Sequence, residues 1–377
     1  MSENDSYQKL IDHHKKWIFG SPGPELLHEV FELMFTPDEA EFLSKIPFNG
    51  NGIGYKANYL SKKLKIPIDE LIEKLDDFAR RGVVYRYHEG KAIRYANGDL
   101  NFMFYRGPWW AGIDNELHIK LAPLVNKYYE EAFGPMVMGE KTILMRAVPI
   151  NKTVEDTRTI MPYEDVVKHL DNYEYYSVGH CGCRRRHNVD PAYENSKYPT
   201  ETCLHFGALG RYAVENGISR EITKEETLEI LKQAADAGLV HGFENTIDGG
   251  STVCNCDPDY CFWFDSMLKM PDPVPRGMQK SNYIREINEE KCVKCGLCAK
   301  VCPIEALEFK KEEKELIFYK EKCVGCGVCA HQCPKEAIYM KHREGEADIP
   351  KSGIEFGTRW LKERGRDFVK FAQDNSF

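Results

Sequence analysis

The chain has 377 residues, enough for two or three domains, and its 42% hydrophobic and 29% charged residues are typical of globular proteins rather than disordered chains. The net charge of −8 excludes a general binder of nucleic acid or of anionic membranes. The first residues are polar and no long apolar run occurs, so we expect a cytoplasmic protein without a signal peptide or membrane span.

Residues 1–100 are predicted to form a winged-helix-like docking domain. FTPDEAEFLSKI begins with a capping box of Thr36 and Glu39, KANYLSKKLKI favours a second helix, and IDELIEKLDDFARRG has the apolar periodicity of a third. VVYRYHEGKAIRYANG then alternates as a hairpin around Glu89 and Gly90. Three helices followed by a hairpin is the winged-helix order.

The third predicted helix carries the wrong charge for DNA. It has a net charge of −2, whereas basic residues supply nearly all nonspecific affinity for phosphates. We therefore expect no nucleic-acid partner and interpret this domain as a docking module. The charged residues of the helix are Asp69, Glu70, Glu73, Lys74, Asp76, Asp77, Arg80 and Arg81.

Residues 101–149 are expected to be an aromatic linker and packing segment. The stretch NFMFYRGPWWAGID is dense in aromatic side chains, which dominate both domain cores and interfaces. Packing between domains is the favoured interpretation, and a surface for a partner subunit is the alternative.

Residues 150–282 are predicted to form a middle helical domain with cysteine-rich loops. MPYEDVVKHLDNY, TCLHFGALGRYAVENG and ITKEETLEILKQAADAG have helical patterns, and EYYSVGHCGC favours a strand that runs into a tight loop. All fourteen cysteines of the chain follow residue 180. In a reducing compartment such clustering argues for metal ligation over disulfides.

Two C-x-C pairs in this domain indicate a metal centre. In an extended strand, residues i and i+2 lie on the same face about 7 Å apart, so two thiolates can reach one cluster from the same side. With a further cysteine at a helix start, the pairs offer five thiolates, enough for a third [4Fe–4S] cluster. The predicted ligands are Cys181, Cys183, Cys203, Cys254 and Cys256.

Three consecutive arginines follow the first C-x-C pair and are the predicted cofactor-binding residues, because fixed cations beside a negatively charged cluster raise its potential. Three alternatives stay open: a zinc site that uses cysteines with His180 or His205, a catalytic metal or cofactor site at which the arginines bind an anionic substrate, and buried free thiols. The last interpretation is favoured for Cys261. The arginines are Arg184, Arg185 and Arg186.

Residues 283–342 contain a duplicated cysteine motif. CVKCGLCAKVCPIEALEF begins at Cys292, and CVGCGVCAHQCPKEAIYM follows at an offset of 31 residues from Cys323; both have the pattern C-x2-C-x2-C-x3-C-P. Thiolates are the soft ligands that iron–sulfur clusters require, and a pair of zinc ribbons is the alternative. Between the copies, KKEEKELIFYKEK predicts a β-hairpin.

The duplicated motif resembles bacterial two-cluster ferredoxins, which hold two [4Fe–4S] clusters. In that family the fourth cysteine of each run binds the other cluster. The resemblance implies that one cluster is held by Cys292, Cys295, Cys298 and Cys333. It implies that the other is held by Cys302, Cys323, Cys326 and Cys329.

The middle domain also resembles, loosely, uncharacterised iron–sulfur proteins of anaerobes that pair a C-x-C-R stretch with a later C-N-C. Asp257 stands where a further cysteine is expected in that pattern, which puts the ligand set in doubt. The C-terminal residues 343–377 are predicted to form a charged amphipathic helix that packs against the ferredoxin module or a partner.

The sequence thus predicts an α+β protein: an N-terminal winged-helix-like domain, a middle helical cysteine-rich domain and a C-terminal two-cluster ferredoxin-like module. The predicted function is to relay single electrons, in an anaerobic or microaerobic cell, through two [4Fe–4S] clusters and a third centre. The recipient is a partner oxidoreductase, with a flavoprotein or reductase subunit as the redox partner. Two alternatives are an oxidoreductase that reduces a small anionic substrate at the middle centre and an iron–sulfur redox sensor that binds DNA. Whether the chain itself catalyses a reaction stays open.

Overall fold

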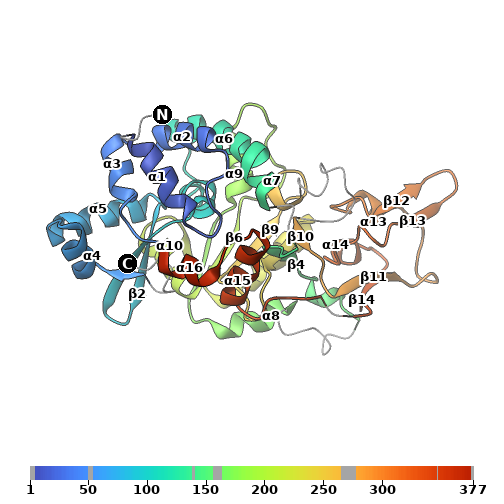
Figure 1. Cartoon of the computed structure of the whole chain (residues 1–377). Helices are drawn as coiled ribbons and strands as arrows, with labels where there is room; N and C mark the ends of the chain where they lie inside the picture. Colours follow the sequence, from blue (N-terminus) through green and yellow to red (C-terminus); the bar gives the residue numbers. More distant parts are fainter. Residues whose placement is uncertain are drawn as a thin grey trace.

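The structure is a computed structural model that describes residues 5–49, 54–137, 141–155, 164–264, 277–345 and 347–374. Helices and strands alternate along the chain, which confirms the α+β class. The N-terminal helices lie at one end of the molecule and the strands of the ferredoxin-like module lie at the other, with a mixed layer of sheet and helices between them (Figure 1).

The N-terminal part begins with two helices. A third helix, a strand, two more helices and a hairpin follow in that order. The three strands pair in the order β1-β3-β2. The expected capping box is formed, since Thr36 and Glu39 exchange side-chain to backbone hydrogen bonds. The elements are α1 (Ser6–Lys15), α2 (Pro24–Met34), α3 (Pro37–Leu43), β1 (Tyr55–Lys56), α4 (Ala57–Leu64), α5 (Ile68–Arg80), β2 (Val84–Glu89) and β3 (Ala92–Asn97).

The aromatic segment that follows is buried inside the chain rather than displayed on its surface. Phe104, Trp109 and Trp110 are each at most 1% exposed, so these rings pack between the N-terminal helices and the sheet. The segment folds as η1 (Asn101–Arg106), η2 (Gly107–Trp109), α6 (Glu116–Tyr128), η3 (Tyr129–Phe133) and α7 (Gly134–Val137).

A seven-stranded sheet forms the centre of the molecule, with strand order β10-β4-β8-β9-β6-β5-β7. The expectation of a mainly helical middle domain therefore needs correction. Its strands are two to six residues long and several are buried on both faces, so they lack the polar alternation that reveals a strand in a sequence. The strands are β4 (Met145–Ala147), β5 (Tyr176–His180), β6 (Glu201–Phe206), β7 (Arg220–Ile222), β8 (Val240–Glu244), β9 (Thr252–Cys256) and β10 (Met278–Gln279).

Short helices connect these strands and cover the sheet. The expected capping residue Thr223 accepts a hydrogen bond from the backbone of Glu226, and Gly238 ends the same helix in the left-handed conformation. The connecting helices are η4 (Asn151–Thr153), α8 (Val166–His169), η7 (Leu170–Asn172), α9 (Gly182–Val189), α10 (Gly207–Glu215) and α11 (Lys224–Ala237).

The ferredoxin-like module consists of two antiparallel strand pairs and two short helices. The hairpin expected between the two cysteine motifs is present as β12 and β13. Its elements are β11 (Tyr283–Ile287), α13 (Leu297–Lys300), β12 (Leu307–Lys310), β13 (Glu315–Phe318), α14 (Val328–His331) and β14 (Ile338–His342).

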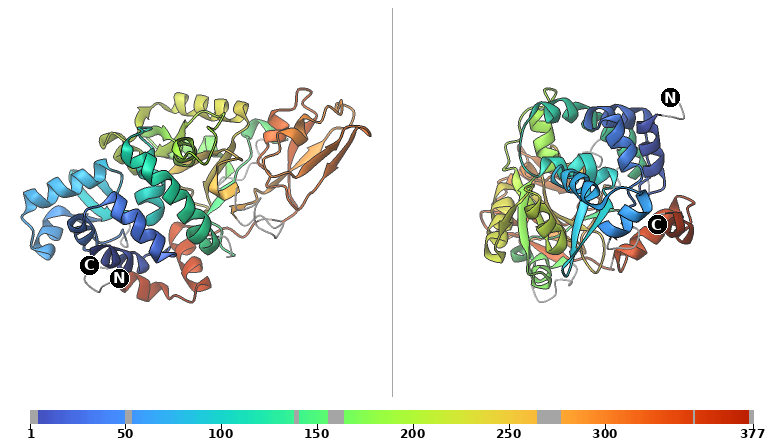
Figure 2. Two further views of the ribbon diagram at one scale, coloured as in Figure 1. Left: turned by 90° about the horizontal axis from the view of Figure 1, so that it is seen from above. Right: turned by 90° about the vertical axis from the view of Figure 1, so that its left-hand side faces the viewer.

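The C-terminal helices α15 (Gly353–Glu363) and α16 (Phe368–Asp374) return to the N-terminal part of the chain. The Trp360 and Phe19 rings meet edge to face at 5.7 Å, and the Arg366 guanidinium donates to the carbonyl of Trp17. Packing against the ferredoxin module or a partner was expected. In the structure α15 lies beside the N-terminal helices (Figure 2), and its buried Trp360 contacts Phe19, which follows α1.

Candidate metal centres

The two cysteine motifs of the ferredoxin-like module fold in the same way. At three positions of each motif, 31 residues apart, the backbone has a positive φ, which lets the loop curl tightly. Because the repeat extends to backbone conformation, the two loops present their cysteines alike. The matched pairs are Lys294 with Gly325, Gly296 with Gly327, and Glu305 with Glu336.

Each loop surrounds a cavity lined by four cysteines. One cavity, of about 500 Å³, is lined by three cysteines of the first motif and the last cysteine of the second. The other, of about 20 Å³, is lined by three cysteines of the second motif and the last cysteine of the first. The cysteines of the larger cavity are Cys292, Cys295, Cys298 and Cys333, and those of the smaller one are Cys302, Cys323, Cys326 and Cys329.

Backbone donors and one arginine complete these two sites. The backbone N–H of Ala306 donates to the Cys302 sulfur at 3.2 Å, and that of Ala337 donates to the Cys333 sulfur at 3.3 Å. Arg285, from β11, lines both cavities; it is 6% exposed, and its Nη2 atom has no hydrogen-bond partner among the described residues. Soft thiol donors, N–H groups aimed at sulfur and a buried cation fit negatively charged clusters. Sequence reasoning missed Arg285.

The two cavities differ in their surroundings. Cys295 of the larger cavity is exposed, and the side chain of Val293 beside it is 57% exposed. In the smaller cavity Cys326 is buried, and its carbonyl accepts a hydrogen bond from the backbone of Ile150 at 3.3 Å. The larger site therefore faces solvent, and the smaller site faces the central sheet.

All six cysteines of the middle domain lie together as one group, which we call the six-thiol cluster. Side-chain interactions connect them in a row, and the two ends of the row also interact electrostatically. None forms a disulfide. The order is Cys181, Cys183, Cys261, Cys256, Cys254 and Cys203.

Cys261, for which the sequence favoured a buried free thiol, is buried and free, and it lies in this cluster. Burial opposes its ionisation, but hydrogen bonds with Cys183 and Cys256 outweigh burial and lower the pKa of Cys261. One sequence signal could have placed Cys261 with the other thiols: it follows Cys256 by five residues. In the structure this stretch is a turn, in which the backbone N–H of Cys261 donates to the carbonyl of Asp257. The aromatic run that follows Cys261 hid that signal.

Three parts of the fold bring the other cysteines together. Cys181 is the N-cap of α9, and Cys183 lies in the first turn of that helix. Cys203 lies on β6, which pairs antiparallel with β9, the strand that carries Cys254 and Cys256. A side chain at Gly182 would approach the carbonyl of Tyr105 within 2.9 Å, so the tight start of α9 depends on glycine there.

The three consecutive arginines have different surroundings. Arg184 is fully buried, donates to the carbonyl of Asn255 and the hydroxyl of Thr202, and interacts electrostatically with the thiols. Arg186 is 1% exposed and lies over the Tyr105 ring at 4.1 Å, near Cys183. Arg185 lies apart, in an ion pair with Asp114. Two of the three cations thus adjoin the cluster.

Arg106 is a further cation at the cluster, and sequence reasoning missed it. Burial alone would lower the pKa of Arg106, but Cys254, Cys203 and Glu244 outweigh burial and raise it. Its Nη2 atom has no hydrogen-bond partner in the described part of the chain. The neighbouring Tyr105 hydroxyl lies 2.9 Å from the Cys183 sulfur. The aromatic segment therefore contributes polar groups to the site as well as packing.

The two candidate histidines differ in position. His205 Nε2 lies 3.2 Å from the Cys203 sulfur, and burial lowers the pKa of this imidazole to about 3. His180 instead meets the Thr200 hydroxyl at 2.8 Å. Nowhere in the described ranges do three or more His, Cys, Asp or Glu side chains form a group suited to one metal ion. This finding also covers the eight cysteines of the ferredoxin-like module, because the thiols of each set surround a cavity and do not converge on the position of a single ion.

Two cavities with four thiols each, on duplicated loops, are the arrangement expected of a ferredoxin-like module. Comparison with known families agrees: residues 285–340 match the family described as the 4Fe-4S dicluster domain. The C-terminal module is therefore ferredoxin-like, binds 4Fe–4S cofactor and gives the chain an iron–sulfur electron-transfer role. None of the curated proteins matches the chain. Among the described helices, none has the length and apolar character needed to cross a membrane.

Proposed function

We propose that this chain is an electron-transfer protein or subunit that relays single electrons through two [4Fe–4S] clusters and a third centre to a partner oxidoreductase. We call the larger, solvent-facing ferredoxin-type site the outer site and the smaller one, next to the central sheet, the inner site. The observation that carries the proposal is the continuity between the inner site and the six-thiol cluster. Cys326 and Cys256 belong to one hydrophobic core that also contains Met145, Ile150 and Met278.

The chain between these two sites is short and is held by backbone hydrogen bonds on both sides. Ile150 donates its backbone N–H to Cys326, and Val148 donates its backbone N–H to the carbonyl of His241 on β8. On the same strand, a side chain at Gly242 would lie 3.3 Å from the Cys256 sulfur. The segment that leads into the central sheet thus contacts the ferredoxin-type site directly and reaches the six-thiol cluster through β8, and a packed path of this kind suits electron transfer.

The proposed ligand sets follow the lining of the cavities. The outer cluster is assigned to Cys292, Cys295, Cys298 and Cys333, and the inner cluster to Cys302, Cys323, Cys326 and Cys329. The third centre, a [4Fe–4S] cluster, takes its ligands from the six-thiol cluster. Four thiolates hold a cubane, so two of the six remain for a second role at that site.

Cations next to the thiols favour the reduced state of the centres they adjoin, because reduction adds negative charge. Arg285 occupies this position between the two ferredoxin-type sites, and Arg106, Arg184 and Arg186 occupy it at the six-thiol cluster. We propose that the third centre therefore has the higher potential and receives the electrons.

The exposed side of the outer site is the proposed position of the redox partner, a flavoprotein or reductase subunit. Cys295 and Val293 are exposed there, whereas the inner site is enclosed by the sheet. A donor that docks on this face approaches the outer cluster first.

The N-terminal domain supports a winged-helix interpretation with a docking role. Its elements α3, β1, α4, α5, β2 and β3 occur in that order. The hairpin is tied to α10, since Arg86 and His88 both contact the carboxylate of Glu215. Helix α5 is tied to α10 as well, since the Tyr212 hydroxyl donates to the carbonyl of Ala79. The β2–β3 hairpin is the wing of this domain. A wing that is held against the rest of the protein and an acidic α5 are both unfavourable for DNA binding.

The iron content of anaerobically purified protein tests the proposal. Three cubanes require about twelve irons per chain. Replacing Cys181 and Cys183 together by serine should remove about four of them, because serine is a harder and far less acidic ligand, and should leave the ferredoxin-type spectrum unchanged. A wild-type content near eight irons would overturn the third centre, and stoichiometric zinc in addition would favour a zinc site.

A further inference from the structure

A cavity of about 760 Å³ lies over the six-thiol cluster, where the N-terminal domain, the central sheet and the C-terminal helix meet. Its volume is in the range of small-molecule binding sites. All six cysteines of the cluster contribute to its lining, and the opposite wall includes Phe19, Tyr173, Phe206 and Phe356. Only part of this space is adjacent to the thiols, so room for a ligand remains beside them.

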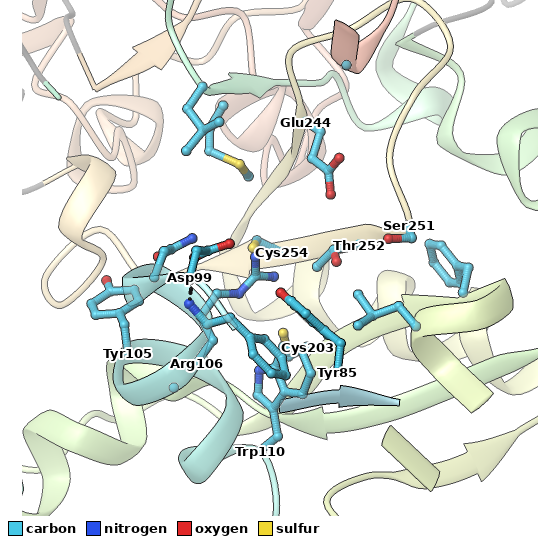
Figure 3. Close-up of a pocket in the computed structure, with 18 of the residues that line it drawn as sticks. Tyr85, Asp99, Tyr105, Arg106, Trp110, Cys203, Glu244, Ser251, Thr252 and Cys254 are labelled. Carbon is cyan, nitrogen blue, oxygen red and sulfur yellow. Dashed lines mark hydrogen bonds between the residues drawn. The ribbon is translucent and has the colours of Figure 1, made fainter. Parts of the chain in front are cut away.

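The described lining of the cavity includes the guanidinium of Arg106 and carboxylates near it. In Figure 3 the Glu244 side chain points into the cavity from β8, toward Arg106 and Cys254, and Asp99 lies at the side. Among the described residues, Arg106 Nη2 has no hydrogen-bond partner, and the Glu244 carboxylate interacts electrostatically with Arg106 and Cys254. Two polar groups are therefore available to a molecule placed between them.

Aromatic rings form the wall next to Arg106. Tyr85 stacks on Phe102 at 4.0 Å, Phe102 meets the Trp110 ring at 5.6 Å, and Arg106 lies over Trp110 at 5.5 Å. All three rings line the cavity and are held by this packing, and Figure 3 shows Tyr85 and Trp110 beside Arg106. A planar, conjugated body fits such a wall, while a guanidinium binds a carboxylate with two parallel hydrogen bonds.

We propose that this cavity binds a small aromatic carboxylate, with its carboxylate on Arg106, its ring against Tyr85 and Trp110, and a hydrogen-bond donor at its far end directed to Glu244. The inference deepens the proposed function, on which it rests for the redox centre beside the ligand. It also differs from the sequence-based expectation for an anionic substrate. None of the three consecutive arginines lines the cavity, and each is engaged elsewhere.

The test is calorimetric titration of the anaerobic full-length protein with 4-hydroxybenzoate and with its neutral amide, 4-hydroxybenzamide. We expect the acid to bind more tightly than the amide by about tenfold or more, since a charge-assisted bidentate contact is lost with the amide. Arg106→Met should remove this preference. Arg185→Met is the matched control, because the Arg185 ion pair lies outside the cavity, and it should keep the preference.

A second variant keeps the proposal testable if Arg106→Met does not fold. Glu244→Met removes both acceptor oxygens at a similar size and should remove the preference of the protein for 4-hydroxybenzoate over benzoate. Equal binding of acid and amide by the wild-type protein, or an unchanged preference in Arg106→Met, would overturn the inference. Iron content is measured on the same samples. A shortage of iron with acid-selective binding would refute the third centre alone, whereas full iron without selective binding would refute the ligand site alone.

Discussion

Gly327 lies where the inner ferredoxin-type loop meets the central part of the molecule, and its replacement by alanine should weaken that junction. Its φ is +78°, and a methyl group there would approach the Thr153 hydroxyl at 2.7 Å and the backbone nitrogen of Ile150 at 3.2 Å. Gly345 has a similar φ of +79°, but nothing lies within 4 Å of the position its methyl group would take. The two glycines thus separate backbone strain from crowding.

The expected magnitudes follow from these contacts. Alanine in the left-handed conformation costs about 1–2 kcal/mol at either position. At Gly327 the crowding against Thr153 and Ile150 adds about 1–3 kcal/mol, typical of overpacking. The difference between the two variants is therefore about 1–3 kcal/mol, which corresponds to about 2–12 °C in an apparent thermal midpoint.

The assay is anaerobic heating of both variants and the wild-type protein while the visible absorbance of the clusters is recorded. Gly327→Ala should lose its absorbance at the lower temperature. Equal midpoints for Gly327→Ala and Gly345→Ala would refute the packing of the inner loop on Ile150 and Thr153, and with it the continuity on which the relay depends.

Four further outcomes are expected. Burial lowers the pKa of His13 to about 4, below the unfolded value of about 6.5, so this group should cost up to about 1.4 kcal/mol of stability per unit as pH drops through that window. Other buried histidines add to the slope, so urea unfolding of His13→Gln should show a pH slope smaller by about that amount, and an identical slope would contradict this. Arg285→Met should lower the potentials of both ferredoxin-type clusters in a redox titration without loss of iron, and unchanged potentials would argue against its role. Trp360→Ala should destabilise the protein by about 3–5 kcal/mol because this fully buried ring packs on Phe19, and a change below 1 kcal/mol in urea unfolding would contradict that packing. Duplex DNA should not form a tight, salt-sensitive complex in a low-salt gel-shift assay, and such a complex would contradict the docking role of the acidic α5.

The ferredoxin-like module and the helices α3, α4 and α5 could be predicted from the sequence because their signals are local. The cysteine spacing fixes the loops that hold the clusters, and the capping box of Thr36 and Glu39 forms as expected. The hairpin between the motifs is likewise determined by a short alternating stretch.

The central sheet and the full site could not be predicted, because both depend on contacts between distant segments. Cys261 reaches the other thiols only when β9 ends beside the start of α9, and Arg106 reaches them from a segment whose aromatic composition indicates packing alone. The course of α15 back to Phe19 is a third such case, since an apolar helix face does not identify its partner.

The number of electrons that the chain accepts tests the relay most directly. Anaerobic reductive titration of the wild-type protein should consume about three electrons per chain, one for each cubane, with the third centre reduced first. The Cys181→Ser/Cys183→Ser variant should consume about two and keep the signals of the ferredoxin-type clusters. Two electrons in both proteins would contradict the account, because the six-thiol cluster would then carry no redox centre.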